Sequence, residues 1–394
     1  MLKKLNACDY YIAIWALYYL QGVLYPQGII NRLLQLIMIL WAGIVTIKSL
    51  KSALKSPFLK VTLYLVLMYC IYGGWIILFG NVPNKSGWAP PTYTYLQVSL
   101  NSLLPIFLFF YYAKKGLINA NRIIKYSIIF LLVSVIIFYK NKYSVMTKLD
   151  KEEITNNMGY LFVSLLPLVF FFYKRPILQY TLLAIIGVFI FMGIKRGAIL
   201  IGSLSIIFFI YSNFKSANRK QKIGIILLSI GIIIGAMYYL SYMMQTSDYF
   251  VKRIEQTAEG NSSGRDRIYS SILEAFLNET NIFYLLFGHG ANATIGIAGN
   301  YAHQDWLETI FNNGIIGVLI LSSFFVIMAK TVYKQRHRFP KYMYYSFFLV
   351  LFISFAKTII SMSIQDMHIS QNLLLGYFAY WSTHPNEKYN MINS

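Results

Sequence analysis

Cysteine and charge are both scarce in this chain of 394 residues. The two cysteines, Cys8 and Cys70, show no disulfide or metal-binding spacing, so we expect both to be packing residues. Only 12% of the residues are charged, whereas 57% are hydrophobic, and so little polar surface could not cover a soluble protein of this length. The composition therefore excludes a soluble globular protein and predicts a polytopic membrane protein.

Apolar stretches repeatedly reach the roughly 20 residues that a helix needs to cross the hydrocarbon core. Strands of a membrane barrel would be about half as long and would alternate in polarity, so these runs favour helices. We predict an all-α protein whose residues 1–394 form a single transmembrane domain of about twelve helices. The predicted spans are 8–25, 29–47, 57–79, 95–113, 121–139, 156–173, 176–194, 196–214, 223–244, 305–329, 342–360 and 366–381.

The basic residues give an independent check on these spans, because positive charges accumulate on the cytoplasmic side of short loops. With a cytoplasmic amino terminus, that side receives 22 of the 35 basic residues and two of the 14 acidic residues. The net charge of +21 therefore indicates topology, with both termini cytoplasmic, and the lipid bilayer as a partner. The basic residues show no nucleic-acid-binding pattern, so no nucleic acid partner is predicted.

This topology predicts external segments at 80–94, 140–155 and 245–302. Asp150, Glu152 and Glu153 in the second segment fit either an acidic metal site or a solvated loop balanced by lysines. We favour the solvated loop and predict no metal site. The third segment is too long for an ordinary connection, and such segments are usually functional or disordered.

An amphipathic helix is predicted within segment 245–302. Ser263 followed by Asp266 fits a capping box, which places Arg265 and Arg267 in the first turn. Free backbone amides and the helix dipole favour an anion there, so these arginines are predicted to bind one; the alternative is two solvated arginines. The apolar stripe that follows consists of Ile268, Ile272 and Phe276.

Further cations are predicted at the outer level of the membrane. Arg196 lies at the tight turn between the seventh and eighth spans, and Gly197 after it lets a ligand approach closely. We predict that Arg196 and Arg265 are catalytic, and that Arg32, Arg253, Arg267 and Lys357 bind substrate. Ionisable groups at this depth are costly unless paired or facing water, but snorkelling to lipid phosphate explains Arg32 and Lys357 equally well.

His303 begins the tenth span, just before Asp305 and Glu308. Histidine can take and return a proton near neutral pH, so His303 is a candidate for a catalytic role and Glu308 for substrate binding. On a helix, Asp305 and Glu308 point away from His303, so neither a dyad nor a metal site within this helix is expected. Any carboxylate partner must come from elsewhere, and a lone boundary histidine is more often structural.

The chain has no nucleotide-binding loop, so the energy for a reaction outside the membrane must arrive within the substrate. A polyprenyl-pyrophosphate-linked glycan meets this requirement. Its lipid lies in the bilayer, arginines neutralise the leaving pyrophosphate, and a base activates the acceptor hydroxyl.

Four motifs follow one another in the second half of the chain: IKRGAIL around Arg196, SSGRDRIY around Arg265, FGHG at 287–290 and AHQDWLETIFNNGIIG from residue 302. NNMGYLFVSLLPL at 156–168 precedes them. Their order and spacing resemble the O-antigen ligase and polymerase superfamily, including bacterial Wzy-type polysaccharide polymerases, over residues 156–325. Lys195 stands where a serine often precedes the arginine, and Gln304 where an asparagine often follows the histidine.

The resemblance implies a GT-C-type, metal-independent glycosyltransferase without a cofactor, acting at the outer face of the bacterial cytoplasmic (inner) membrane. It implies that Arg196 and Arg265 bind undecaprenyl pyrophosphate and that His303 assists or orients deprotonation of the acceptor sugar. The partners would be an undecaprenyl-pyrophosphate-linked glycan donor and acceptor, a chain-length regulator and a flippase. The product would be O-antigen, capsular polysaccharide or exopolysaccharide.

Polymerase and ligase share this machinery and differ in the acceptor, which is another lipid-linked repeat for one and lipid A core or a protein for the other. We favour the polymerase, because the short cytoplasmic loops and modest external segment fit a minimal enzyme. The alternative from another class is a flippase for lipid-linked oligosaccharide. A flippase predicts paired halves and charges near the midplane, whereas the charges here cluster at the outer face.

Overall fold

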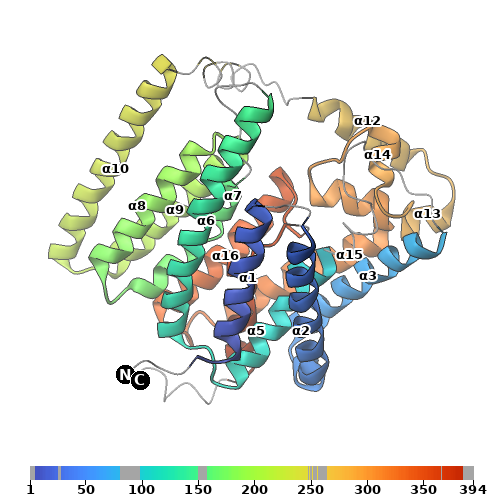
Figure 1. Ribbon diagram of the computed structural model, residues 1–394, viewed down its shortest axis with the longest axis horizontal. Coiled ribbons are helices and arrows are strands. Elements are labelled where there is room, and N and C mark those ends of the chain that lie inside the picture. The colour runs from blue at the N-terminus through green and yellow to red at the C-terminus, as the bar shows by residue number, and fades with distance from the viewer. Residues whose placement is uncertain are drawn as a thin grey trace.

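The computed structural model describes residues 5–24, 28–79, 98–149, 158–246, 264–364 and 366–384, and the single residues 248, 251 and 255. Every element of regular structure in these residues is a helix (Figure 1). The predicted all-α fold is confirmed, and the chain is a polytopic membrane protein. The long helices lie side by side, and the short helices that follow α10 in the chain gather beyond the end of α3.

The helices share high apolar content and differ widely in length. In chain order they are α1 (Ala7–Leu24), α2 (Ile29–Ala53), α3 (Pro57–Phe79), the π-helix η1 (Val98–Leu103), α5 (Leu104–Lys114), α6 (Ala120–Leu149), α7 (Gly159–Val163), the 3₁₀-helix η2 (Leu166–Phe172), α8 (Pro176–Met192), α9 (Arg196–Ser216), α10 (Arg219–Thr246), α12 (Arg265–Leu277), α13 (Ile282–Phe287), α14 (Ala293–Ala298), α15 (Asp305–Lys334), α16 (Lys341–Ile360) and α17 (Ile369–Thr383).

Each of the twelve predicted spans overlaps one or two of these helices. Among the described residues, six helices are long and apolar enough to cross a membrane by length and composition, and the count of twelve spans stays a prediction. These six are Ile29–Ala53, Pro57–Ile76, Ala120–Tyr143, Arg196–Lys215, Asp305–Lys334 and Lys341–Ile360.

One predicted loop is partly helical. Residues 140–149 of the second external segment are not a loop, because α6 continues to Leu149. No glycine or proline lies between residues 140 and 149 to end the helix, and the polar residues there are compatible with it. Asp150, Glu152 and Glu153 lie outside the described residues, as does segment 80–94.

The centre of the molecule is α17, whose residues 369–381 are all buried. It packs against α5 and α16. At Gly376 an added Cβ would lie 2.5 Å from the carbonyl oxygen of Ile106, so α17 and α5 meet backbone to backbone. Aromatic rings fill the other side, with Phe347 and Phe378 centroids 4.7 Å apart. This tight packing fixes the position of the segment that joins α16 to α17.

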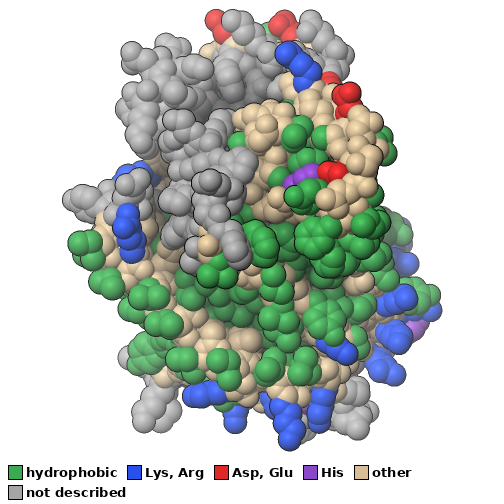
Figure 2. Space-filling model, turned by 90° about the vertical axis from the view of Figure 1, so that its right-hand side faces the viewer, with side chains coloured by type: hydrophobic (Ala, Val, Ile, Leu, Met, Phe, Trp, Pro, Cys, Tyr) green, Lys and Arg blue, Asp and Glu red, His purple; other side chains and the backbone are tan. Residues whose placement is uncertain are grey.

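The two ends of the molecule differ in charge. In the face that Figure 2 shows, Lys and Arg side chains gather at the lower end, Asp and Glu side chains at the upper end, and a hydrophobic belt lies between them. A belt of this kind suits the hydrocarbon core of a membrane, with both charged ends in water.

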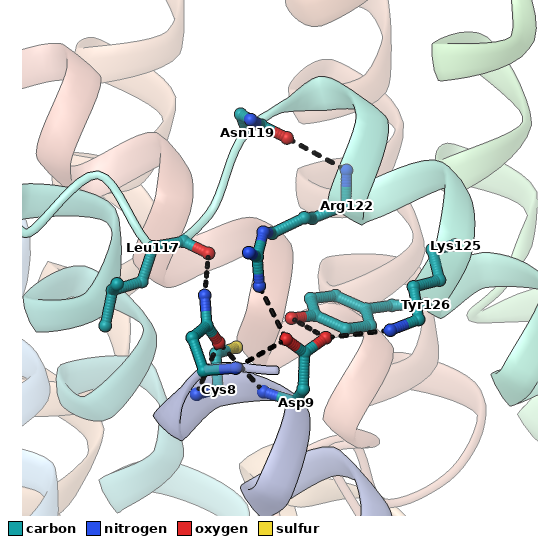
Figure 3. Close-up of polar contacts among 8 residues, drawn as sticks. Cys8, Asp9, Leu117, Asn119, Arg122, Lys125 and Tyr126 are labelled. Carbon is teal, nitrogen blue, oxygen red and sulfur yellow. Dashed lines mark hydrogen bonds and ion pairs between the residues drawn. The ribbon is translucent and has the colours of Figure 1, made fainter. Parts of the chain in front are cut away.

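A polar cluster joins α1 to the start of α6 (Figure 3). The Asp9 carboxylate accepts hydrogen bonds from Arg122 at 2.6 Å, Lys125 at 3.0 Å and the Tyr126 hydroxyl at 3.1 Å. Its side chain is only 7% exposed, and a carboxylate so deeply placed is stable only when it is paired. The cluster therefore fixes where the first helix begins. The nearby Cys8 is buried and, like Cys70, forms no disulfide.

Candidate functional site

The first arginine of the candidate site begins α9. Arg196 is the first residue of this helix and is half-buried. A Cβ added to Gly197 would meet the Tyr160 hydroxyl and would lie 2.5 Å from the Ile360 side chain, so only glycine lets this helix end come so close. Ile194 before it has a φ of 49°, which is strained for a β-branched residue. The turn before Arg196 is thus held in a costly conformation by its surroundings.

The second arginine begins α12, and it reaches the same place. Its guanidinium Nη1 donates a hydrogen bond of 2.9 Å to the carbonyl oxygen of Ile360, at the end of α16. Ile360 also lies against Gly197, so the start of α9 and the Arg265 side chain both reach Ile360. Two segments separated by nearly seventy positions in the sequence are therefore brought close to one residue.

The predicted N-cap of α12 is wrong by one residue. Gly264, with a φ of 79°, caps the helix, and Ser263 lies outside the described residues. Gly264 takes the left-handed conformation. This conformation turns the chain sharply into the helix without a capping hydrogen bond from a serine side chain. The amphipathic character is confirmed, since the buried Ile272 packs against Ala302 and Phe311.

The helix α15 is broken at Gly314, where φ is 68° and ψ is −168°. The break leaves carbonyl groups of the preceding turn without their usual helical partners. The FGHG motif supplies the donors: the His289 amide binds the Phe311 carbonyl at 2.9 Å, and the Gly290 amide binds the Asn312 carbonyl at 3.0 Å. The motif therefore pairs the carbonyls at the break and separates α15 into a short first segment, 305–313, and a longer apolar segment.

The His289 side chain completes this junction. Its ring stacks between Tyr284 and Phe311, with centroids 4.6 Å away on each side, and its Nε2 lies 3.1 Å from the Glu279 carboxylate. These contacts give His289 a structural role. They also explain why aromatic residues and a carboxylate lie around it.

Replacing Gly288 by alanine is expected to separate FGHG from α15. The new Cβ would lie 2.5 Å from the Asn312 oxygen and the Asn313 nitrogen, and the φ of 75° with a ψ of 178° suits glycine alone. Backbone strain costs about 1–3 kcal/mol, before the clash is added. Thermal unfolding in detergent measures the loss. Gly299→Ala is the control, because its φ is also positive but nothing lies within 4 Å of its Cβ; equal melting temperatures for the two variants would contradict this account.

Glu308 is buried in the short first segment of α15 and binds the residues around it. It is 3% exposed, and it accepts hydrogen bonds from the Thr294 hydroxyl at 2.8 Å, the Asn312 amide at 2.9 Å and the Ala302 backbone amide. These contacts give Glu308 a positioning role, and its predicted contact with substrate stays a prediction. His303, next to the held Ala302, has a φ of 55°, so its backbone is strained at the point where α15 begins.

Asp305 connects this helix start to the segment between α16 and α17. Its Oδ2 accepts hydrogen bonds from the backbone amides of Ser363 at 2.6 Å and Ile364 at 3.1 Å. Asp305 is two residues from His303 and is 3% exposed. The segment after Ile360 is therefore held against the helix start that carries His303.

Lys357 and Asp366 form an ion pair beside these contacts. The Lys357 ammonium lies 2.7 Å from the Asp366 carboxylate and donates to the Asp366 backbone carbonyl at 2.9 Å. It also lies 5.1 Å from the centroid of the Tyr160 ring. Snorkelling to lipid does not describe Lys357, since its side chain is 3% exposed. It is instead paired inside the protein, as costly intramembrane charges must be.

Asp366 belongs to this neighbourhood, although it was not predicted from the sequence. The Lys357 ammonium favours the ionised form of this carboxylate, because an opposite charge 2.7 Å away stabilises it. The Nε2 atom of His368 lies 3.9 Å from the same carboxylate. From the sequence Asp366 only marks the start of the last predicted span, because nothing local shows that Lys357 faces it.

The structure thus brings Arg265 and Lys357 to the segment 360–366, together with Gly197, which follows Arg196, and Asp305, which is two residues from His303. It does not place the others there. Arg267 is exposed on α12, Arg32 is exposed near the start of α2, and Arg253 lies outside the described residues. Within the described ranges, no group of three or more His, Cys, Asp and Glu side chains is arranged to hold a metal ion.

Comparison with known families agrees with the order of these motifs. Residues 180–322 match a family model described as O-antigen ligase, a range that includes Arg196, Arg265 and His303. No curated protein matches the chain. Members of the matched family are glycosyltransferase-like enzymes, either ligases or polymerases. The resemblance predicted from the motifs is thereby supported over residues 180–322, which are similar to the O-antigen ligase family.

Proposed function

We propose that this protein polymerises undecaprenyl-pyrophosphate-linked oligosaccharide repeat units into O-antigen, capsular polysaccharide or exopolysaccharide. It acts as a GT-C-type glycosyltransferase at the outer face of the bacterial cytoplasmic membrane, with twelve spans and both termini in the cytoplasm. The reaction uses no metal and no cofactor, since the donor carries its own leaving group.

The observation that carries this proposal is that Ile360 lies against Gly197, the residue after Arg196, and accepts a hydrogen bond from Arg265. Each arginine is the first residue of its helix, where unpaired backbone amides and the helix dipole already favour an anion. Two arginines that begin helices and approach the same residue suit two linked phosphates better than a single carboxylate. Guanidinium groups bind phosphate oxygens in pairs of hydrogen bonds, and this supports a diphosphate as the ligand.

In the proposed reaction, a hydroxyl oxygen of the acceptor sugar forms a bond to the anomeric carbon of the donor. The bond between that carbon and the diphosphate oxygen breaks, and the electron pair leaves with the diphosphate. Arg196 and Arg265 stabilise the charge that develops there, which is the kind of interaction that contributes most to catalysis. His303 orients the acceptor hydroxyl, and Lys357 positions Asp366.

The second candidate function is that of a ligase, because the matched family model is described as O-antigen ligase. The donor half of the reaction is then the same. The acceptor is lipid A core or a protein in place of a second lipid-linked repeat.

Reconstitution in liposomes tests the proposal. Purified protein is supplied with lipid-linked repeat units from a strain that lacks this chain, and released undecaprenyl pyrophosphate and glycan length are both measured. A polymerase releases diphosphate and lengthens the glycan. A ligase releases diphosphate only when lipid A core or an acceptor protein is added. Movement of the lipid across the bilayer without diphosphate release would show a flippase and contradict the proposal.

A further inference from the structure

A cavity of about 100 Å³ lies between α1, α2, η1 and the start of α17. Much of its lining is polar, although it is surrounded by apolar helices. The residues that define its character are Trp15, Tyr18, Tyr19, Asn101, Ser102 and Asp366. Asn101 and Ser102 belong to the π-helix η1, and π-helical turns are frequent at functional sites.

Asp366 is the charged group of this cavity. Its side chain is 59% exposed, whereas that of its partner Lys357 is 3% exposed. One side of the carboxylate therefore faces Lys357, and the rest is open to the cavity. An ionised carboxylate so placed can accept a proton from a group that enters the cavity.

The cavity is connected to the arginines through two side chains. Lys357 lies 2.7 Å from Asp366 on one side and 5.1 Å from the Tyr160 ring on the other. The Tyr160 hydroxyl lies against Gly197, next to Arg196. In glycosyl transfer the attacking hydroxyl and the leaving diphosphate are on opposite sides of one carbon, so their protein partners must be near each other without touching. Lys357 and Tyr160 lie between Asp366 and the turn that carries Arg196, and this separation suits the two roles.

The shape and lining of the cavity suit one edge of a sugar. A volume of about 100 Å³ holds roughly three waters at about 30 Å³ each, which is enough for a hydroxyl and part of a ring but not for an oligosaccharide. Trp15 and Tyr19 have centroids 5.0 Å apart, and Tyr18 and Tyr19 have centroids 5.2 Å apart. Such rings provide a flat apolar surface with polar edges, against which a sugar can pack.

We propose that this cavity is the acceptor subsite and that Asp366 is the general base of the transfer; this inference rests on the proposed function. The acceptor hydroxyl enters the cavity and attacks the anomeric carbon of the donor. Its proton passes to a carboxylate oxygen of Asp366 as the bond to diphosphate breaks. The proton then leaves to water, and the carboxylate is restored. His303 remains an orienting residue at the neighbouring helix start.

The test uses Asp366→Asn in the full-length reconstituted protein. Asparagine keeps the size of the side chain, and the backbone carbonyl of residue 366 still accepts from Lys357. With lipid-linked repeats as donor and acceptor, the rate of glycan lengthening is expected to fall by at least about 100-fold, the usual contribution of a general base. Glu274→Gln, an exposed carboxylate on α12, is the matched control and is expected to keep the wild-type rate.

Azide separates a base from a merely structural carboxylate. The azide anion attacks the anomeric carbon without carrying a proton, so it needs no base. With azide added, Asp366→Asn is expected to release diphosphate and form glycosyl azide within a few-fold of the wild type, whereas Arg265→Ala is not.

Three results would overturn the assignment of Asp366. They are lengthening by Asp366→Asn within about five-fold of the wild type, failure of azide to restore diphosphate release in that variant while it is folded, and, where Asp366→Asn is unfolded, lengthening at the wild-type rate by a folded Asp366→Ser. A wild-type protein that releases no diphosphate, with or without azide, would instead overturn the proposed function on which the assignment rests.

Discussion

Replacing Arg265 by alanine is expected to reduce diphosphate release by about 100- to 1,000-fold while the protein stays folded in the membrane. The loss follows from the chemistry of the leaving group, because a preorganised donor aimed at developing charge contributes a factor of this size. Little stability should be lost, since Arg265 is half-buried and its bond of 2.9 Å to the Ile360 carbonyl crosses a region that water can enter. Diphosphate release by the reconstituted protein is the measurement.

Arg196→Ala is expected to give a loss of the same order, because Arg196 begins the second helix at the same place. The matched control is Arg219→Ala. Arg219 is also the first residue of a helix, α10, and is exposed, but it lies at the end of α9 away from Arg196. Lysine at 265 should restore part of the rate, since it keeps the charge but not the paired hydrogen bonds. Equal rates for Arg219→Ala and Arg265→Ala would show a general effect of charge on insertion and would contradict a diphosphate site.

Asp305→Ala is expected to detach the segment between α16 and α17 and to remove both stability and activity. The substitution leaves the amides of Ser363 and Ile364 without their acceptor, and each buried, unpaired amide costs about 1–3 kcal/mol. The loss of about 2–6 kcal/mol is a large part of the stability of a typical domain. Activity should fall with it, because the same segment carries Asp366.

Asp305→Asn separates the anchoring role from a role for the charge. Both amides bind one oxygen, Oδ2, and the asparagine carbonyl can replace that oxygen. Asp305→Asn should therefore keep most of the stability and rate that Asp305→Ala loses, as measured by thermal unfolding in detergent and by diphosphate release. If the asparagine variant is as inactive as the alanine variant but is stable, the charge of Asp305 matters in itself, and the anchoring account is wrong.

The helices could be predicted from the sequence because the signal for a membrane helix is local. Apolar runs of about 20 residues mark them, and the amphipathic stripe that contains Ile272 predicts α12 in the same way. The wrong predictions arise where the local sequence is compatible with two different helix boundaries. Nothing between residues 140 and 149 ends a helix, so α6 continues to Leu149, and either Ser263 or Gly264 could have begun α12.

The candidate site could be predicted only in part. Arg196, Arg265 and His303 were found because their motifs occur in a characteristic order, and Lys357 because an intramembrane charge is costly. Asp366 was missed, since its importance depends on the lysine that faces it from α16. For Glu308 the residue type suggested substrate binding. The sequence did not show that Thr294, Ala302 and Asn312 would donate hydrogen bonds to its carboxylate.

The sequence by itself determined that this chain is an all-helical membrane protein, that its charge is divided unequally, and which superfamily its central motifs resemble. Those properties depend on composition and on spacing along the chain. Only the tertiary structure decided that Gly197 and Arg265 both meet Ile360, that FGHG binds the carbonyls at the break before Gly314, and that Asp366 opens onto a cavity. Such contacts depend on how each helix is rotated and tilted against its neighbours, and packing across the whole bundle sets those angles.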